Sequence, residues 1–231
     1  MAVPYILKRS RKRRKTISLQ ISNKSEVVVS APYFTPGSEI NRFIQEKQIW
    51  INKSIQKQKT AQLQIKKNEY VSGEEFYYLG EPYPLEIFFQ QDLPAGLVFW
   101  SNRFYLNCKE GSAKGEYYFF KWYKAKAQEY FSKRLNFLSY HLQLLPGKIR
   151  ITSAQQRWGS CSEENNIAFT FRLMMAPPTV IDYVIIHELM HIKGKNHSAN
   201  FWKLVEVVMP EYKTHRRWLK DNGHKFGLSR V

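Results

Sequence analysis

The run HELMHIKGKNH, from His187 to His197, places three histidines and a glutamate within eleven residues. His187 and His191 are four residues apart, so on a helix both side chains project from one face, one turn apart. Their imidazoles can then reach a single metal ion, while Glu188 turns away from the metal and faces a water on it. This H-E-x-x-H spacing predicts a helix that carries a metal site, with Glu188 as general base.

The residues after this helix supply a third ligand. Gly194 follows His191 by three residues, where a helix commonly stops, and glycine accepts the left-handed conformation of such a stop. The chain can reverse there and bring His197 back to the metal, although Glu206 is an alternative third ligand. Three protein ligands leave a fourth position for water, which distinguishes catalytic zinc from a closed structural site. We therefore expect a hydrolase that uses Zn²⁺ or another divalent metal.

The alternative is that these histidines are ordinary core residues. Residues 179–186, which lead into the motif, are strongly apolar and follow Pro177 and Pro178, so they predict a buried helix. Two histidines and a glutamate in one buried turn carry a large desolvation penalty unless a metal or hydrogen-bonding partners satisfy them. Burial therefore favours the metal site.

The balance of charge is strongly basic, with 36 Lys and Arg against 19 Asp and Glu and a net charge of +17. Seven basic residues lie between Lys8 and Lys15 with no acid among them, and a second basic set lies between Lys213 and Lys225. Such a surplus attracts polyanions, so nucleic acids, nucleotides and acidic peptides are candidate partners. A basic run can equally be a solvated face, so charge alone does not identify the partner.

Composition narrows the class of protein. A hydrophobic fraction of 43% excludes a disordered chain, and 231 residues can bury a substantial core. No apolar run reaches the length of a membrane helix, and the N-terminal residues lack the charge order of a secretory signal. Two cysteines, Cys108 and Cys161, are too few for a disulfide framework. We expect a cytoplasmic protein with no membrane partner.

Hydrophobic periodicity predicts an α+β fold in two domains. Residues 1–112 are expected to form a small β-rich module with one long helix, and residues 113–231 the catalytic domain, joined through the Gly-, Lys- and Ser-rich stretch 109–115. The expected strands are residues 16–22, 26–31, 76–79, 83–89, 97–100, 104–108, 149–153 and 167–171. The expected helices are residues 38–63, 116–145, the motif helix from 179, and two more that begin near 198 and 210.

The sequence resembles the YgjP-like family of zinc metallohydrolases, which is related to the SprT-like and Wss1-like (WLM) peptidases. The resemblance rests on HELMH, on NHSANFW after it and on QRWGSCS before it, and extends to SRKRRKTISLQI, APYFTP, KQIWINK and YYLGEPYPL. It implies metal ligands His187, His191 and His197, with Glu188 as catalytic acid and base. It also implies a compact zincin-like catalytic domain, in which a long helix and the motif helix back a small sheet whose edge strand lines the cleft.

The histidine spacing also matches the longer metzincin pattern. A Met-turn should then follow, but the only later methionine, Met209, ends an apolar helical stretch where packing explains it. Few residues remain after His197 for the usual lower subdomain. The compact YgjP-like domain is therefore the better expectation.

The stretch Arg157, Trp158, Gly159 and Ser160 is expected near the edge strand of the cleft. One interpretation is a loop that contacts substrate, with Arg157 orienting a carbonyl or a phosphate. The other is that Trp158 belongs to the core and Gly159 merely permits a turn. Both interpretations stay open at this point.

Three functions are compatible with these features. The first is a metallopeptidase that acts on peptides or proteins with Glu188 as general base. The second is a nucleotide phosphohydrolase on the same site, which the positive field favours but the lack of a Gly-rich phosphate loop disfavours. The third is a basic nucleic-acid-binding protein with a structural zinc, which gives Glu188 no role. A fourth interpretation combines the first and the third: a peptidase that is recruited to DNA through the basic N-terminal run.

Overall fold

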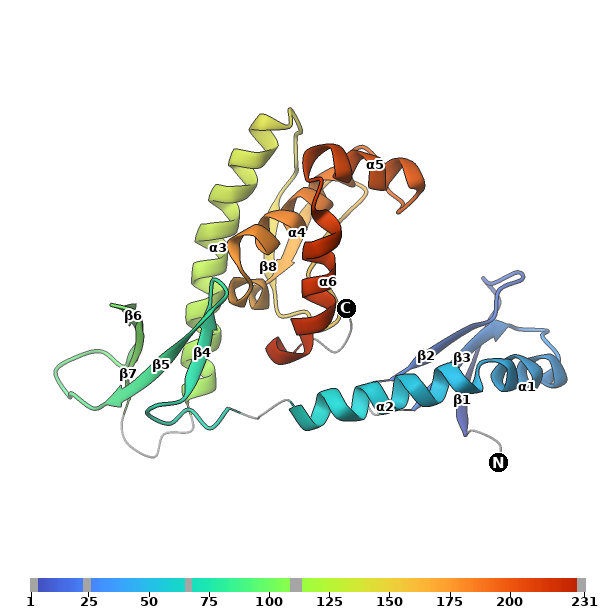
Figure 1. The fold of residues 1–231 in the computed structure, drawn as a ribbon, viewed down its shortest axis with the longest axis horizontal. Helices are drawn as coiled ribbons and strands as arrows, with labels where there is room; N and C mark the ends of the chain where they lie inside the picture. Colours follow the sequence, from blue (N-terminus) through green and yellow to red (C-terminus); the bar gives the residue numbers. More distant parts are fainter. Residues whose placement is uncertain (1–3, 23–25, 65–67, 109–113, 228–231) are drawn as a thin grey trace. The chain divides into compact units, whose positions relative to one another are not determined.

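The computed structural model describes residues 4–22, 26–64, 68–108 and 114–227, the side chains of 57–64 excepted, and has the expected mixture of helices and small sheets (Figure 1). The α+β prediction is confirmed. Contacts divide the chain into two compact units, residues 1–66 and 67–231, and each is described by itself. No described helix is both long enough and apolar enough to cross a bilayer.

The first unit is a three-stranded sheet with two helices. The strands are β1 (Tyr5–Ser10), β2 (Ser18–Ile21) and β3 (Val27–Pro32), and the helices are α1 (Gly37–Glu46) and α2 (Gln48–Gln64). The strand order is β1-β3-β2, with β2 antiparallel and β1 parallel to β3. The expected hairpin is therefore confirmed. Its core contains alternate residues of β3 and one stripe of the helices: Ile21, Val27, Val29, Ala31, Ile40, Ile44 and Ile51.

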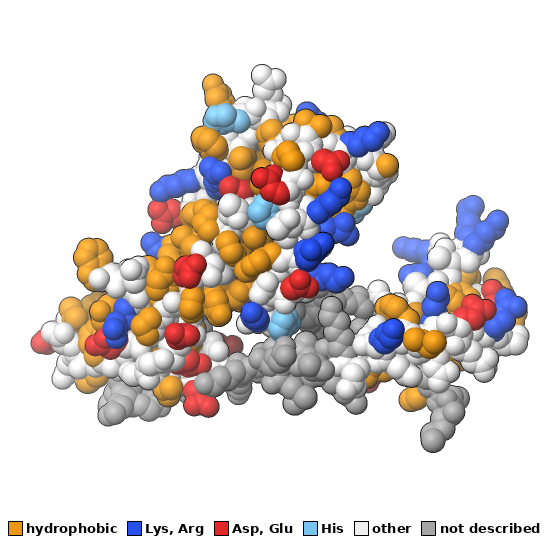
Figure 2. All heavy atoms as spheres, in the orientation of Figure 1, with side chains coloured by type: hydrophobic (Ala, Val, Ile, Leu, Met, Phe, Trp, Pro, Cys, Tyr) orange, Lys and Arg blue, Asp and Glu red, His pale blue; other side chains and the backbone are white. Residues whose placement is uncertain are grey.

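Two features of this unit differ from the sequence expectation. The single helix expected over 38–63 is divided in two at Lys47. The N–H of Lys47 donates to the carbonyls of both Phe43 and Ile44, and α2 begins at the next residue. Strand β1 was not expected, because its central residues are exposed and so show no alternation of apolar and polar side chains. Figure 2 shows Lys and Arg side chains gathered over the end of the sheet where β1 leads into the basic run.

The second unit begins with a four-stranded sheet that packs on a long helix. The strands are β4 (Glu75–Tyr78), β5 (Glu81–Phe88), β6 (Gly96–Trp100) and β7 (Arg103–Asn107), in the order β4-β5-β7-β6, and the helix is α3 (Gly115–His141). Both expected hairpins, β4–β5 and β6–β7, are present. Aromatic rings join sheet and helix. The ring of Phe76 stacks on that of Phe119 with centroids 3.9 Å apart, and the rings of Phe104 and Trp122 have centroids 5.1 Å apart.

This packing changes the domain boundary. A division at residue 112 would separate β4–β7 from α3, with which they share one hydrophobic core. The structure instead divides near residue 66, so the expected boundary falls inside the second unit. The Gly- and Lys-rich composition around 109–115 indicated a linker, but it gave no information about the aromatic contacts between the β4–β7 sheet and α3. Residues 109–113 lie outside the described residues.

The remainder of the second unit forms a small sheet with helices. Its elements are β8 (Ile149–Thr152), β9 (Gly159–Cys161), β10 (Ile167–Thr170), the 3₁₀ helix η1 (Phe171–Met175), α4 (Pro178–Met190), α5 (Ala199–Val208), α6 (Tyr212–Asn222) and the 3₁₀ helix η2 (Gly223–Phe226). The strand order is β8-β10-β9, with β8 parallel and β9 antiparallel to β10. Helix α4 contacts α3, α5, α6 and β9, so it lies at the centre of this unit.

Two contacts fix this arrangement. Phe131 of α3 packs on Phe169 of β10, with ring centroids 5.5 Å apart. Arg134 of α3 forms two hydrogen bonds, of 2.6 and 2.7 Å, with the carboxylate of Asp182 in α4. Strand β9 was not expected, because it is only three residues long and begins with glycine. The long helix and the motif helix therefore back the small sheet, and β9 is its outer strand next to α4.

Candidate metal centre

Helix α4 holds the first two candidate ligands. It begins at Pro178, which is favourable at the first helical position, and most of its residues are buried. His187 lies on the last turn of α4 and His191 is its C-cap residue; their ring centroids are 5.0 Å apart. The buried apolar helix that the sequence predicted is thus present, and it brings two imidazoles to one place.

The chain then turns and returns His197 to the same place. The amides of Lys193 and Gly194 both bond to the carbonyl of Met190, and α5 begins after Ser198, whose side chain accepts from Phe201 N. Gly194 is not among the glycines with positive φ, so the left-handed stop expected there is wrong: a tight right-handed turn suffices. His197 lies in the short segment between this turn and α5.

The three imidazoles converge. One ligand atom from each of His187, His191 and His197 lies within 4.8 Å of the others. Nε2 of His197 is 3.0 Å from Nε2 of His187. Nitrogen ligands around a tetrahedral zinc are about 3.3 Å apart, as zinc–nitrogen bonds of roughly 2.0–2.1 Å require. The distance between the His187 and His197 nitrogens is close to this value, and the third donor lies near enough to complete the group.

Protonation also fits metal binding. Burial, reinforced by the neighbouring His191 and His197, lowers the pKa of His187 to about 3, and burial first of all lowers the pKa of His197. Nδ1 of His191 lies 3.0 Å from the carbonyl oxygen of Gly194. A carbonyl only accepts, so this nitrogen carries a proton and Nε2 is the ring atom left to face a metal. The lowered pKa values of His187 and His197 favour neutral rings, and a divalent metal requires neutral nitrogen donors.

The alternative third ligand has another partner. The carboxylate of Glu206 accepts a hydrogen bond from Lys213 Nζ at 3.1 Å, and half of its side chain is exposed. It does not belong to the group of converging ligand atoms, which among the described residues consists of the three histidines.

Glu188 is buried beside this group, with only 5% of its surface exposed. Burial raises the pKa of its carboxyl to about 8, and the positive charge of Arg157 acts in the opposite direction. The backbone of β9 passes directly over it at Gly159, where an added Cβ would lie 2.6 Å from Oε1 of Glu188. A carboxyl held in this way can take up and release a proton near neutral pH.

A cavity of about 210 Å³ opens beside these residues. Its lining includes Trp158, Gly159, Tyr183, His187, Glu188 and Arg216. The guanidinium of Arg216 lies over the ring of Trp202, 4.7 Å from its centre, and burial raises the pKa of Tyr183 to about 12. Tyr183 and Arg216 were not among the expected site residues. Tyr183 lies on α4 one turn before His187, whereas Arg216 lies on α6 and reaches the cavity through the packing of α6 on α4.

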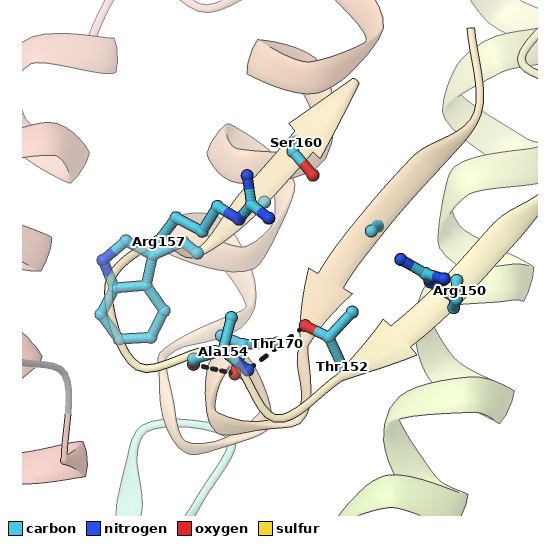
Figure 3. Close-up of a pocket in the computed structure, with 9 residues that line it drawn as sticks. Arg150, Thr152, Ala154, Arg157, Ser160 and Thr170 are labelled. Atoms are coloured by element: carbon cyan, nitrogen blue, oxygen red, sulfur yellow. Dashed lines mark hydrogen bonds between the residues drawn. The ribbon is translucent and has the colours of Figure 1, made fainter. Parts of the chain in front are cut away.

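The stretch Arg157 to Ser160 lies where it was expected, at the edge strand. Trp158 is buried, with 7% of its surface exposed, and its ring lies 6.4 Å from that of Phe226, so the core interpretation holds for this residue. Arg157 is exposed in the loop that leads into β9, and Gly159 and Ser160 begin the strand (Figure 3). Each of the four residues lines a cavity beside β9.

Comparisons with known proteins found one family and a similar solved structure. A family model described as YgjP-like, metallopeptidase domain, matches residues 15–222. A similar solved structure, the crystal structure of the metallopeptidase zymogen of Pyrococcus abyssi abylysin, shares 26% sequence identity. That match covers 39% of this chain and 92% of the other, with a TM-score of 0.36. No curated protein matches the chain.

Proposed function

The chain belongs to the YgjP-like metallopeptidase family, and we propose that it cleaves peptide bonds with a zinc ion held by His187, His191 and His197. The family implies a divalent metal and a peptide or protein substrate; zinc and these three ligands are the proposal. The convergence of the three imidazoles beside a buried glutamate carries it. Hydrolysis of nucleotide phosphoanhydrides, an alternative suggested by the charge, gains no support from the family.

Each side chain has a distinct role in this proposal. When bound, zinc supplies Lewis acidity that polarises the scissile carbonyl and lowers the pKa of a water in the cleft. Glu188 accepts the proton of the attacking water and passes it to the leaving amine. In the metal-free protein, burial raises the pKa of this carboxyl to about 8, so its carboxylate is a stronger base than an exposed one. Because Gly159 has no side chain, the carboxylate of Glu188 can lie directly against the backbone of β9.

The outer edge of β9 is suited to hold an extended peptide. Thr170 N donates to Trp158 O at 3.0 Å, and Ser162 N donates to Asn166 O at 2.9 Å, so alternate residues of this segment bond to β10. The intervening Gly159 then turns its N–H and C=O outward, as antiparallel pairing requires. A substrate that adds to this edge as a further strand gains main-chain hydrogen bonds next to Glu188.

Metal removal tests this function. Protein stripped with a chelator should lose cleavage of a broad peptide library, and stoichiometric zinc should restore it. Cleavage that continues without any bound metal would contradict the proposal. Metal content measured on the same samples excludes contamination as the cause of residual activity.

The first unit supports a second function, binding of single-stranded nucleic acid. Residues 1–66 contain 14 Lys and Arg against three acids. Because β1 is parallel to β3, with Ser10 opposite Pro32, the basic run after β1 and the loop after β3 lie at the same end of the sheet. The side chain of Arg9 bonds to the carbonyls of Tyr33 and Thr35 in that loop.

The loop offers aromatic surface among these charges. The guanidinium of Arg11 lies 5.0 Å from the centre of the Tyr33 ring. The next ring, Phe34, is 89% exposed. Exposed aromatic rings among cations are how proteins hold unpaired bases and their phosphates, with about 1–3 kcal/mol from each stacked base. We therefore assign Phe34 as the base-stacking residue.

Fluorescence anisotropy with a labelled oligo-dT tests this function. Phe34→Ala should weaken binding about fivefold or more, as loss of one stacked base implies. Trp50→Ala, which removes a half-exposed ring of α2 in the same unit, serves as the matched control. Equal affinities of the two variants, or binding that salt does not weaken, would contradict the assignment.

A further inference from the structure

A second, smaller hollow of about 60 Å³ lies on the face of the β8-β10-β9 sheet that points away from the core (Figure 3). The strand register explains it. Arg150 of β8, Ala168 of β10 and Ser160 of β9 form one row across the sheet. The small side chain of Ala168 in the middle leaves space between the two outer strands.

The floor of the hollow is polar and firmly held. Thr170 is 1% exposed, and its hydroxyl donates to Ala154 O at 2.8 Å. The hydroxyl of Thr152 donates to Phe169 O at 3.3 Å and accepts from Ala154 N at 3.4 Å. These bonds tie the loop after β8 to β10, so the hollow has a fixed shape.

Two positive charges face this hollow. The side chains of Arg150 and Arg157 extend toward each other from opposite sides of it (Figure 3). In the described part of the chain, neither guanidinium has a carboxylate within 4.0 Å. Guanidinium groups without a carboxylate partner are suited to bind one from a ligand.

The hollow and the metal centre lie on opposite faces of β9. The missing side chain of Gly159 would point at Glu188, whereas Ser160 lines the hollow. Residues directly opposite each other in a strand pair point to the same face, and neighbours along a strand alternate. In a peptide bound along β9, the residue opposite Ser160 therefore points into the hollow and its neighbours point toward Glu188.

We propose that this hollow is a specificity pocket for an acidic side chain of the peptide substrate, held between Arg150 and Arg157. The inference rests on the proposed peptidase function and names its substrate class: peptides with Asp or Glu at the position opposite Ser160. The small hollow admits a carboxylate at the end of a flexible side chain more readily than a ring. The charge also separates Glu from Gln, which have nearly the same shape.

Binding and cleavage of matched peptides test the pocket. Fluorescein-labelled hexapeptides carry a single Glu or Gln at each position in turn in an alanine background. Dissociation constants are measured on metal-loaded Glu188→Gln protein, and kcat/KM on wild type. At one position, Glu should be preferred over Gln about tenfold, the effect of one charge-assisted hydrogen bond.

Two variants test whether Arg150 causes the preference for Glu over Gln. Arg150→Gln should reduce the Glu-to-Gln ratio to about threefold or less. Lys148→Gln is the matched control, because it removes a positive charge from the exposed residue before β8, outside the hollow, and should keep the ratio. Thermal unfolding of both variants checks that the sheet is intact.

The outcomes separate the two proposals. Selective binding of Glu peptides that wild type does not cleave would overturn the peptidase proposal alone. The pocket proposal is overturned if cleavage shows no preference for Glu, or if no peptide binds. It is also overturned if Arg150→Gln leaves the Glu-to-Gln ratio unchanged, or if Lys148→Gln lowers that ratio equally.

Discussion

Gly159 lies against Glu188, so closely that a Cβ atom on the glycine would be 2.6 Å from Oε1 and 2.7 Å from Cγ of the glutamate. The backbone at Gly159 does not have a positive φ, so space rather than conformation requires glycine here. Direct contact therefore fixes β9 relative to Glu188. We expect β9 to hold the substrate and the Glu188 carboxylate to move the proton.

Gly159→Ala should displace Glu188 and lower kcat/KM at least about tenfold, because small displacements of catalytic groups carry large rate penalties. Metal content should stay near one ion per chain, since the three atoms nearest to the new methyl group all belong to Glu188. Gly96→Ala is the control: it also lies in a strand of this unit, but nothing stands within 4 Å of its added Cβ. Equal activities of the two variants would show that the contact is unimportant.

His197→Ala should weaken zinc binding by more than about 100-fold, which is the upper range for loss of an outer-shell partner. His197 is exposed, so the fold of the metal-free protein should be unaffected, as unfolding curves would show. Glu206→Ala tests the alternative ligand, and we expect it to leave zinc affinity unchanged because Glu206 pairs with Lys213. A reversed order of the two affinities, measured by chelator competition, would replace His197 by Glu206.

The metal-free protein should respond to pH through Glu188. Burial raises the pKa of this carboxyl from its ordinary 4.5 to about 8, so between these values the folded state binds more protons than the unfolded state. Stability from this group is therefore present below pH 4.5 and is lost as the pH rises toward 8. Glu188→Gln removes that loss.

Chemical denaturation of chelator-treated wild type and Glu188→Gln measures this effect. The variant should gain stability relative to wild type at pH 8, and the difference should shrink toward pH 4.5. His187, whose pKa burial lowers to about 3, has the opposite sign and destabilises both proteins as the pH falls below 6.5, so it cancels in the comparison. A difference independent of pH would contradict the buried setting of Glu188.

The ion pair between Arg134 and Asp182 should stabilise the packing of α3 on α4. Asp182→Asn removes the charge from a partly buried, two-bond contact, so the free energy of unfolding should fall by about 2 kcal/mol. Glu129→Gln, which breaks the exposed pair with Lys133 on the same α3, should change stability little. Equal effects in urea denaturation would mean that burial adds nothing to the Arg134 contact.

Local sequence patterns predicted much of this molecule. The spacing from His187 to His197 predicted that three histidines and Glu188 lie close together, and in the structure they do, because one helix and one tight turn determine their positions. The hairpins β2–β3, β4–β5 and β6–β7 followed from alternation and turn residues. These elements depend only on residues near them in the chain.

The features that sequence missed depend on distant contacts. Strand β1 is exposed along its centre, and β9 has three residues, so neither shows a hydrophobic pattern. Arg216 reaches the cavity through the packing of α6 on α4. The pocket between Arg150 and Arg157 exists only because strand register places Ala168 between β8 and β9. Such relationships require the pairing of strands, which single-strand patterns do not specify.

We propose that Glu188 moves the proton while the three histidines hold the metal. The most direct test measures zinc content and peptide turnover on the same samples of wild type and Glu188→Gln. This division of roles predicts one zinc per chain in both proteins and turnover in the variant lower by about 10²–10⁴-fold, the usual contribution of a general base. Zinc-loaded Glu188→Gln protein with the turnover of wild type would contradict it.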